Sequence, residues 1–459
     1  MKIVMFTDAY WPRVNGVTVS VDSFSHALIR AGHEVMIICS FYPESAEGSR
    51  HGRKGEVEKA GDREPFILRV ASMPLPLPVS KEDRLAKFTQ WFRVSKRIEE
   101  FGPDILHIHS EFVMAEFGYF YARLHNLPAV YTLHTNWADY GPSYFPWAPK
   151  FLLGFLARLV HRPAMRRADV IIVPTVRMRE LLRRYKVKVP SVQLYTGIDP
   201  VVFHYNREEA QKFRTDMEEE YPLLRGKRIL LYAGRVTAEK NVGFLVRILP
   251  TIVRRHPDTA LLMAGNGPDL DEFQEECGRM GLSEHCVFTG YLDRKVLALT
   301  YGFSDIFVFP SLTETQGLVT IEAMLSGTPV VAIGEMGTAE VMNGDNGGFM
   351  VKNDPVEFTR RVCELLEDKE LYRRKAAEAR EYAQGWTIDV MTAKLEGIYR
   401  DTIASYREKY GMPKVPLWEL ITDRRWWKAN NRKFWKMTVK RWRKITDIWR
   451  PITDIWKPQ

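Results

Sequence analysis

Short apolar runs alternate with helical patterns along most of the chain, and this alternation constrains the fold more than any other feature. The first run, KIVMF at 2–6, is almost uninterrupted, which is typical of a strand buried on both faces. A helical pattern closed by Gly32 follows it, and further strand-like runs lie at 34–40, 104–110, 128–135, 169–175 and 192–199. The pattern predicts a parallel, doubly wound α/β sheet.

The same alternation restarts in the second half, with apolar runs at 227–236, 258–268, 286–292, 305–311 and 328–334. A chain of 459 residues is also too long for one ordinary core. We therefore expect two Rossmann-like domains, at 1–198 and 199–385, with a helix at 386–410 that crosses back onto the first. Loops at the carboxyl ends of such strands hold ligands, so these ends are expected to face each other across a cleft.

Composition narrows the class of protein. A hydrophobic fraction of 45% and a charged fraction of 27% are those of a globular protein. The four cysteines show no CxxC pairing, which argues against a zinc site or a disulfide framework and suits a reducing compartment. The first apolar run is too short for a signal peptide, and no uncharged apolar stretch approaches roughly 18 residues. We expect a cytoplasmic protein without a transmembrane helix.

Two segments that follow strands in the second half have features of a phosphate site. AGRVTAEKN at 233–241 places Arg235 and Lys240 in one loop, where both cations can reach a diphosphate. AGNGP at 264–268 supplies Gly265 and Gly267, whose missing side chains let the backbone approach a ligand closely. Each segment alone is equally compatible with turn chemistry and ordinary surface cations.

A third segment, TETQGLVTIEAM at 313–324, places two glutamates around a helix that is expected to start near Gly317. The positive end of that helix favours an anion. Glu314, in the loop, would accept hydrogen bonds from sugar hydroxyls, and Glu322 would accept them from a ribose diol. A solvated helix start explains the two glutamates taken alone. Three such segments on successive strand ends together predict a nucleotide-sugar site.

The series GRVTAEKN, GNGP and TETQGLVTIEAMLSGTPVVA resembles the retaining glycosyltransferases of the GT-B fold, family 4-like and group 1, over about residues 1–410. The resemblance implies that Arg235 and Lys240 bind the donor diphosphate and take part in catalysis. It also implies that Glu314 contacts the donor sugar and acts in the chemical step, and that Glu322 contacts the ribose. The resemblance implies no cofactor and no metal requirement, so the cations and the helix dipole would have to stabilise the leaving phosphate.

In the first half, TDAYWPRVNGVTVSV resembles the glycine-containing loop of that family, and LHIHSEF resembles its active-site histidine segment. Histidines that follow a strand are otherwise mostly buried, hydrogen-bonded core residues. The resemblance implies the remaining site residues, which are the catalytic His109, the donor-binding Asn15, Gly16, Gly234, Gly265, Gly267, Gly317 and Leu318, and the acceptor-side His134, Asp139 and Tyr140.

The resemblance also implies retention of the anomeric configuration. No carboxylate of the first half is convincingly placed as a covalent nucleophile, so we favour same-face displacement, in which the departing phosphate helps to deprotonate the acceptor.

Several motifs, HTNWADY among them, most resemble bacterial 1,2-diacylglycerol 3-alpha-glucosyltransferases, which glycosylate a lipid at the inner membrane face. The stretch 144–170 agrees with this, because it mixes aromatic and basic residues as interfacial helices do. An inter-domain packing helix with a solvated basic face is the alternative. The membrane residues predicted in this stretch are Trp147, Phe151, Phe155 and Arg158.

The region 411–459 is expected to be a basic, Trp-rich tail for membrane association. Residues 412–459 hold 13 Lys and Arg against 4 Asp and Glu, whereas the other 411 residues hold 53 of each. Such residues suit an anionic bilayer surface. Two alternatives are docking on protein, the chain itself included, and binding to nucleic acid, which we do not expect. Four tryptophans recur every seven residues: Trp435, Trp442, Trp449 and Trp456.

These observations lead to one hypothesis, a peripheral membrane enzyme that moves a hexose from a nucleotide sugar, UDP-glucose, to diacylglycerol in glycolipid biosynthesis. The alternative is a mannosyl- or galactosyltransferase that acts on another lipid or on a soluble sugar. A hypothesis of a different class is a non-catalytic membrane scaffold, which would have no need of the predicted cationic and acidic residues.

Overall fold

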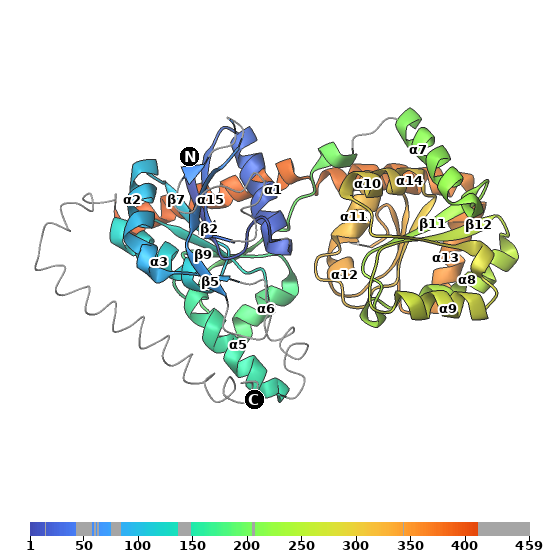
Figure 1. The fold of residues 1–459 in the computed structure, drawn as a ribbon, viewed down its shortest axis with the longest axis horizontal. Coiled ribbons are helices and arrows are strands. Elements are labelled where there is room, and N and C mark those ends of the chain that lie inside the picture. Colours follow the sequence, from blue (N-terminus) through green and yellow to red (C-terminus); the bar gives the residue numbers. More distant parts are fainter. Residues whose placement is uncertain are drawn as a thin grey trace, which may run out of the picture. The chain divides into compact units, whose positions relative to one another are not determined.

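The structure is a computed structural model, and it describes residues 1–13, 15–42, 57–58, 61, 64–74, 84–135, 148–203, 207–342 and 344–411. It contains two compact units, each of which is built around its own sheet (Figure 1). Unit 1 comprises Met1–Ile172, Leu182–Val192 and the chain from Glu396 onward. Unit 2 comprises Val173–Leu181 and Gln193–Leu395.

Unit 1 contains an eight-stranded sheet in the order β10-β9-β8-β7-β1-β2-β4-β3. The central strand β1 pairs in parallel with both β2 and β7, and only β3 is recorded as antiparallel to its neighbour. The chain order of the strands therefore reverses direction between β1 and β7. The bounds are β1 Lys2–Thr7, β2 Glu34–Ser40, β3 Val57–Glu58, β4 Phe66–Val70, β7 Ile105–Ile108, β8 Ala129–Thr132, β9 Val170–Val173 and β10 Ser191–Gln193.

Helices connect these strands, and two short strands, β5 and β6, form a separate antiparallel pair. The apolar sides of α2 and α3 contribute to the core of unit 1, in which Phe117, Met114 and Ile98 are fully buried. Most of α6 and the first part of α15 belong to unit 2. The bounds are α1 Gly16–Arg30, β5 Ser72–Pro74, β6 Arg84–Ala86, α2 Trp91–Phe101, α3 Val113–His125, α5 Lys150–Met165, α6 Val176–Arg184 and α15 Ile388–Tyr410.

Unit 2 contains a six-stranded sheet in the order β13-β12-β11-β14-β15-β16. Numbered along the chain, this is the order 3-2-1-4-5-6 of dinucleotide-binding sheets, and its direction reverses between β11 and β14. All of its recorded pairings are parallel. The bounds are β11 Arg228–Ala233, β12 Thr259–Ala264, β13 Cys286–Gly290, β14 Ile306–Phe309, β15 Val330–Ile333 and β16 Gly348–Val351.

The sheet of unit 2 lies between two layers of helices: in Figure 1, α8, α9 and α13 lie on one side and α10, α11 and α14 on the other. Burial on both faces explains why the strands are almost entirely apolar, as in TALLMA of β12. The bounds are α7 Arg207–Glu220, α8 Gly243–Arg255, α9 Leu270–Arg279, α10 Arg294–Phe303, α11 Leu318–Leu325, α12 Met336–Met342, α13 Pro355–Glu367 and α14 Lys369–Gln384.

The structure confirms the predicted α/β class with two parallel, doubly wound sheets. The sequence analysis did not anticipate β4, in which Arg69 interrupts the apolar run. This side chain is 2% exposed, and its guanidinium donates a hydrogen bond to the carbonyl of Trp11 over 2.8 Å. A loop that is distant in sequence thus supplies a partner for this buried cation, and no local pattern reveals it.

The last helix, α15, belongs to unit 1 through its C-terminal part. The hydroxyl of Tyr399 lies 2.6 Å from Nδ1 of His107 in β7, and the hydroxyl of Tyr406 donates to the side chain of Asn126 over 3.1 Å. None of the helices in the described ranges combines the length and apolar character that crossing a bilayer requires.

Candidate functional site

The candidate donor site lies at the switch point of unit 2, where β11 and β14 are parallel neighbours. The loops that follow these strands are joined by three side-chain contacts. The Lys240 ammonium lies 2.9 Å from a Glu314 carboxylate oxygen. Asn241 donates to the carbonyl of Pro310 over 3.1 Å, and Thr313 donates to the carbonyl of Glu239 over 3.1 Å. The segment predicted to bind the diphosphate and the segment predicted to bind the sugar and the ribose are therefore directly in contact.

Glu314 has more partners than the sequence indicated. One carboxylate oxygen accepts from Lys240, and the other accepts from the backbone N–H groups of Thr315 (3.1 Å) and Gly317 (3.4 Å). The two side chains of the ion pair are 17% and 19% exposed, so it is substantially shielded from solvent. A ligand anion that binds Lys240 must therefore compete with Glu314 or interact with both groups.

Gly317 fixes the start of α11, close to where the sequence predicted a helix. Its backbone is left-handed, with φ of 67°. A Cβ atom at this position would lie 2.7 Å from Val341 Cγ2 and 2.8 Å from the carbonyl oxygen of Gly337. Conformation and space therefore both favour glycine here. Leu318 follows as the first residue of the helix.

Glu322 lies in the second turn of α11 and accepts a hydrogen bond from the hydroxyl of Tyr301 over 3.3 Å. Burial raises the pKa of the Glu322 carboxyl above its ordinary value, while Arg294 and the Tyr301 hydroxyl oppose this rise. The sequence analysis missed Tyr301. It is fully buried in α10 among apolar residues, so only its hydroxyl distinguishes it from an ordinary core position.

Arg235 is exposed, and its guanidinium has no ion pair with any described residue. Its backbone is nevertheless fixed, because the hydroxyl of buried Tyr232 donates to the Arg235 carbonyl over 2.8 Å. Arg235 and Lys240 both lie in the loop that follows β11, but only Lys240 is paired with a carboxylate there. Arg235 offers a solvated cation beside the Lys240–Glu314 pair.

Gly265 and Gly267 have a local packing role that the sequence did not indicate, and their predicted donor contact stays a prediction. A Cβ atom on Gly265 would lie 1.8 Å from the Gly234 carbonyl oxygen, and one on Gly267 would lie 2.0 Å from that of Val236. The backbones of the two loops are hydrogen-bonded, with Gly234 N–H to the Ala264 carbonyl at 3.0 Å. These glycines therefore allow one loop to approach the other, whatever they contribute to a ligand.

The switch point of unit 1 lies between β1 and β7, and histidines are clustered there. His109 follows β7, and its Nδ1 lies 2.9 Å from Nε2 of His134. His109 is 3% exposed, and its Nε2 has no hydrogen-bond partner in the described part of the chain. That nitrogen is the unsatisfied polar atom of the cluster, and it is suited to meet a substrate hydroxyl.

A third histidine, which the sequence analysis missed, supports this pair. His107 lies 3.9 Å from His109 between ring centroids, and its Nε2 lies 2.7 Å from the hydroxyl of Thr132. Burial lowers the pKa of His107 to about 3, that of His134 to about 4 and that of His109 well below its ordinary value. The cluster is therefore uncharged at neutral pH. The sequence signal that could have revealed His107 is its spacing of two residues from His109, because alternate side chains of an extended chain lie on the same face.

Asn15 and Gly16 begin α1, directly after the loop that follows β1. The Asn15 side chain accepts from the backbone N–H of Thr18 over 2.9 Å, so it caps the helix. Gly16 has open space around its missing Cβ, and neither conformation nor packing explains a glycine there. Their predicted donor contact stays a prediction.

The predicted membrane residues are only partly described. Phe151 and Phe155 lie on α5 with 79% and 55% of their surface exposed, and Arg158 is on the same helix. The other predicted membrane residues lie outside the described ranges, namely Trp147, Trp435, Trp442, Trp449 and Trp456, as do the predicted acceptor-side residues Asp139 and Tyr140.

No group of three or more His, Cys, Asp and Glu side chains suited to a metal ion occurs among the described residues.

Comparison with known families agrees with this geometry. The model for family 4 glycosyltransferases matches residues 14–202, and the model for group 1 glycosyl transferases matches residues 213–382. Together these two matches span most of both units. The chain belongs to the family 4, group 1 glycosyltransferases.

Three relatives illustrate the range of this family. An alpha-monoglucosyldiacylglycerol synthase of Streptococcus pneumoniae is 29% identical over 341 residues, which are 73% of this chain and 71% of that protein. A synthase of the same name from Acholeplasma laidlawii is 25% identical over 420 residues, covering 89% of this chain and 99% of that protein. A glycogen synthase of Mycobacterium tuberculosis is 28% identical over 440 residues, covering 91% and 99%.

Solved structures confirm the GT-B fold of this glycosyltransferase. Anabaena HepE in complex with UDP superposes with a TM-score of 0.65 at 16% identity, covering 87% of this chain and 100% of that chain. The sucrose-phosphate synthase of Thermosynechococcus elongatus gives 0.63 at 19% identity, covering 88% and 99%.

The glycine contacts generate a test of the donor loops. Replacing Gly265 with Ala forces a Cβ atom into the Gly234 carbonyl, and we expect a loss of about 2 kcal/mol or more in the free energy of unfolding without any ligand. In the matched variant Gly278→Ala, on α9, the nearest atom is Ser283 Oγ at 3.9 Å, so stability should be unchanged or slightly higher. Thermal and denaturant unfolding measure both. A Gly265→Ala protein as stable as the control, with weakened nucleotide binding only, would mean that this glycine serves the ligand alone.

Proposed function

We propose that this glycosyltransferase is a retaining, metal-independent enzyme that moves glucose from UDP-glucose to diacylglycerol at the cytoplasmic face of a membrane. The observation that carries the proposal is the group of cationic and acidic side chains at the switch point of unit 2. Two relatives named alpha-monoglucosyldiacylglycerol synthases support the lipid acceptor and the sugar. Complexes of the structural neighbour HepE with UDP and with UDP-glucose support the donor class.

In the proposed reaction, unit 2 holds the donor by its central diphosphate and by hydroxyl groups on either side of it. Arg235 and Lys240 take the diphosphate, with the first backbone N–H groups of α11 as further donors. Glu322 accepts from the ribose diol, and its hydrogen bond from Tyr301 fixes the carboxylate. When the diphosphate engages Lys240, Glu314 loses that partner and gains the sugar hydroxyls. The donor thereby replaces an internal ion pair with two ligand contacts.

The proposed chemical step is a same-face displacement. The bond between the anomeric carbon and the diphosphate oxygen breaks, and a bond from the acceptor hydroxyl oxygen to that carbon forms on the same face. The acceptor proton passes to the departing diphosphate, whose negative charge the two cations stabilise. Since the imidazole of His109 is neutral, it would position a hydroxyl through Nε2 without adding charge. A trapped glycosyl adduct on any residue of unit 1 would contradict this mechanism.

Membrane contact is proposed from α5 and from the sequence of residues 412–459. Four apolar side chains of α5 are exposed, whereas Leu153, Leu156 and Ala157 on the same helix are buried. A helix with one side packed and an apolar side in solvent suits the interface of a bilayer. The exposed side chains are Phe151, Leu152, Phe155 and Leu159.

A product assay tests the transfer reaction. Purified protein is incubated with a panel of nucleotide sugars and vesicles that contain diacylglycerol, and the product is identified by mass. We expect glucosyldiacylglycerol from UDP-glucose, unchanged by EDTA. Arg235→Ala and Lys240→Ala should each lower the rate on the order of 10²-fold or more, because each removes a charge-assisted contact to the leaving group.

Arg279→Ala, at the exposed end of α9, is the matched control and should keep the full rate. Full turnover in both site variants would contradict the proposed site. A mannosylated or galactosylated lipid, or a glycosylated soluble sugar, would favour the alternative acceptors and donors, as the glycogen synthase relative does. Absence of any product with the whole panel would favour a membrane scaffold.

Flotation with vesicles tests the tail. Full-length protein should bind anionic vesicles at low salt, and removal of residues 412–459 should weaken binding on the order of tenfold or more, because nine net positive charges leave with them. Raising the salt concentration should weaken the full-length protein more than the truncated one. Unchanged binding after truncation would assign membrane contact to α5 alone and contradict the role of the tail.

A further inference from the structure

A cavity of about 890 Å³ lies in unit 1, far along the sheet from the histidine cluster. It is lined by residues at the amino ends of three strands: Ala129 begins β8, Asp169 precedes β9 and Pro190 precedes β10. His109, by contrast, follows the carboxyl end of β7. The cavity is therefore at the opposite edge of the sheet and is separate from the residues assigned to glycosyl transfer.

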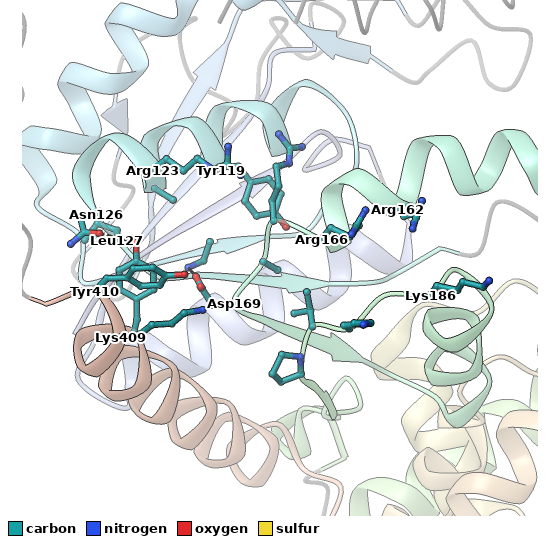
Figure 2. A pocket seen from close by; sticks show the side chains of 18 residues that line it. Tyr119, Arg123, Asn126, Leu127, Arg162, Arg166, Asp169, Lys186, Lys409 and Tyr410 are labelled. Atoms are coloured by element: carbon teal, nitrogen blue, oxygen red, sulfur yellow. Dashed lines mark hydrogen bonds between the residues drawn. The ribbon is translucent and has the colours of Figure 1, made fainter. Parts of the chain in front are cut away.

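The cavity wall is strongly cationic. Figure 2 shows lining side chains from α3, the end of α5 and the end of α15, with Asp169 beside Lys409 and Tyr410. Seven of the lining side chains are Arg or Lys, whereas Asp169 is the only acidic one. Such a surplus on a concave surface concentrates a positive potential that attracts anions.

Two of the seven cations already have partners. Arg167 makes a bidentate pair with Glu116, at 2.8 Å for each contact, and lies over the ring of Tyr119. Lys409 lies over the ring of Tyr410 and beside Asp169 (Figure 2). Asp169 in turn accepts from the backbone N–H of Ala129 over 2.8 Å, and burial raises its pKa. These contacts hold three side chains of the cavity wall in place. They do not neutralise the charge of the other five cations.

The other five cations have no ion pair with any residue in the described ranges. The side chain of Arg162 provides stronger evidence, because its Nε is buried and has no hydrogen-bond partner among the described residues. A buried donor without a partner is costly, and an anion within reach would satisfy it. Guanidinium and ammonium groups around one cavity match a phosphate group in both charge and geometry. The five are Arg123, Arg162, Arg166, Lys186 and Lys188.

The surface of α5 connects this cavity to an apolar stripe. Phe151, Phe155 and Leu159 recur every four residues and are 79%, 55% and 40% exposed. Arg162 and Arg166 continue the same helical face at spacings of three and four residues. If the apolar half of the helix enters a bilayer interface, its basic half lies at the level of the headgroups.

We propose that this cavity is a second binding site, selective for a phosphate group carried either by an anionic phospholipid headgroup or by a soluble phosphate ester. The stripe on α5 favours the phospholipid as its source. The binding test for this site needs neither donor nor acceptor, so its result is independent of the transfer reaction. A failure to bind phosphate here would therefore leave the proposed enzyme activity untouched.

The test uses full-length protein and two double variants that each remove two charges from unit 1. Arg123→Gln with Lys188→Gln alters two exposed positions on different walls of the cavity. Arg93→Gln with Lys96→Gln, on α2, alters two exposed cations that do not line it. Because all four side chains are exposed, both variants should fold, which thermal unfolding verifies.

One arm titrates glycerol 1-phosphate by calorimetry at fixed ionic strength, and the other measures flotation with phosphatidylcholine vesicles with and without phosphatidylglycerol. The cavity variant should lose about tenfold or more in affinity in at least one arm, while the α2 variant stays within about twofold of the unmodified protein. Loss in the first arm identifies a soluble ester, and loss only in the second identifies the lipid. Equal changes in both variants, or no binding by the unmodified protein in either arm, would overturn the proposal.

Discussion

The hydrogen-bonded pairing of β11 with β14 places two loops side by side that are far apart in the chain, and the donor site follows from it. Because the strand order reverses at this pair, the helices that follow the two strands, α8 and α11, lie on opposite faces of the sheet, and such a switch point opens a crevice at the carboxyl ends of the strands. Lys240 from one loop and Glu314 from the other can then form an ion pair at 2.9 Å. The pair holds the loops together and is also a place where a diphosphate can compete.

Lys240 and Glu314 thus have two roles, to join the two loops and to bind the proposed donor. A partly buried ion pair gains little net stability, but either partner alone is left uncompensated. A ligand that brings an anion to Lys240 and hydroxyls to Glu314 supplies both with new partners in one binding event. Arg235, which is solvated and free of ion pairs among the described residues, adds a cation that requires no such exchange.

The sequence was sufficient for the class of fold, the parallel strands and the helix start near Gly317, because strand burial and glycine conformation are local properties. It was insufficient where a partner is distant. Tyr399 meets His107 across 292 positions of sequence, and Tyr301 meets Glu322 across 21. The glycines of 264–268 show the limit differently: the structure reveals a close approach between two backbones that the sequence could not show, and the predicted ligand contact stays a prediction.

Unit 1 shows how one parallel sheet can present different chemistry at its two edges. Neutral, buried imidazoles gather at the carboxyl edge, where positioning a hydroxyl calls for hydrogen bonds without charge. Cations gather at the amino edge around Asp169, beside a helix with an exposed apolar stripe. The imidazoles are buried and uncharged, because burying a charge is costly, whereas most of the cations at the other edge are exposed.

The most direct test is a crystal structure of this glycosyltransferase with UDP-glucose or a non-hydrolysable analogue. The account predicts the diphosphate within hydrogen-bonding distance of Arg235 and Lys240, with the sugar on Glu314 and the Lys240–Glu314 contact lengthened beyond 2.9 Å. A diphosphate bound elsewhere, with that ion pair intact, would contradict it.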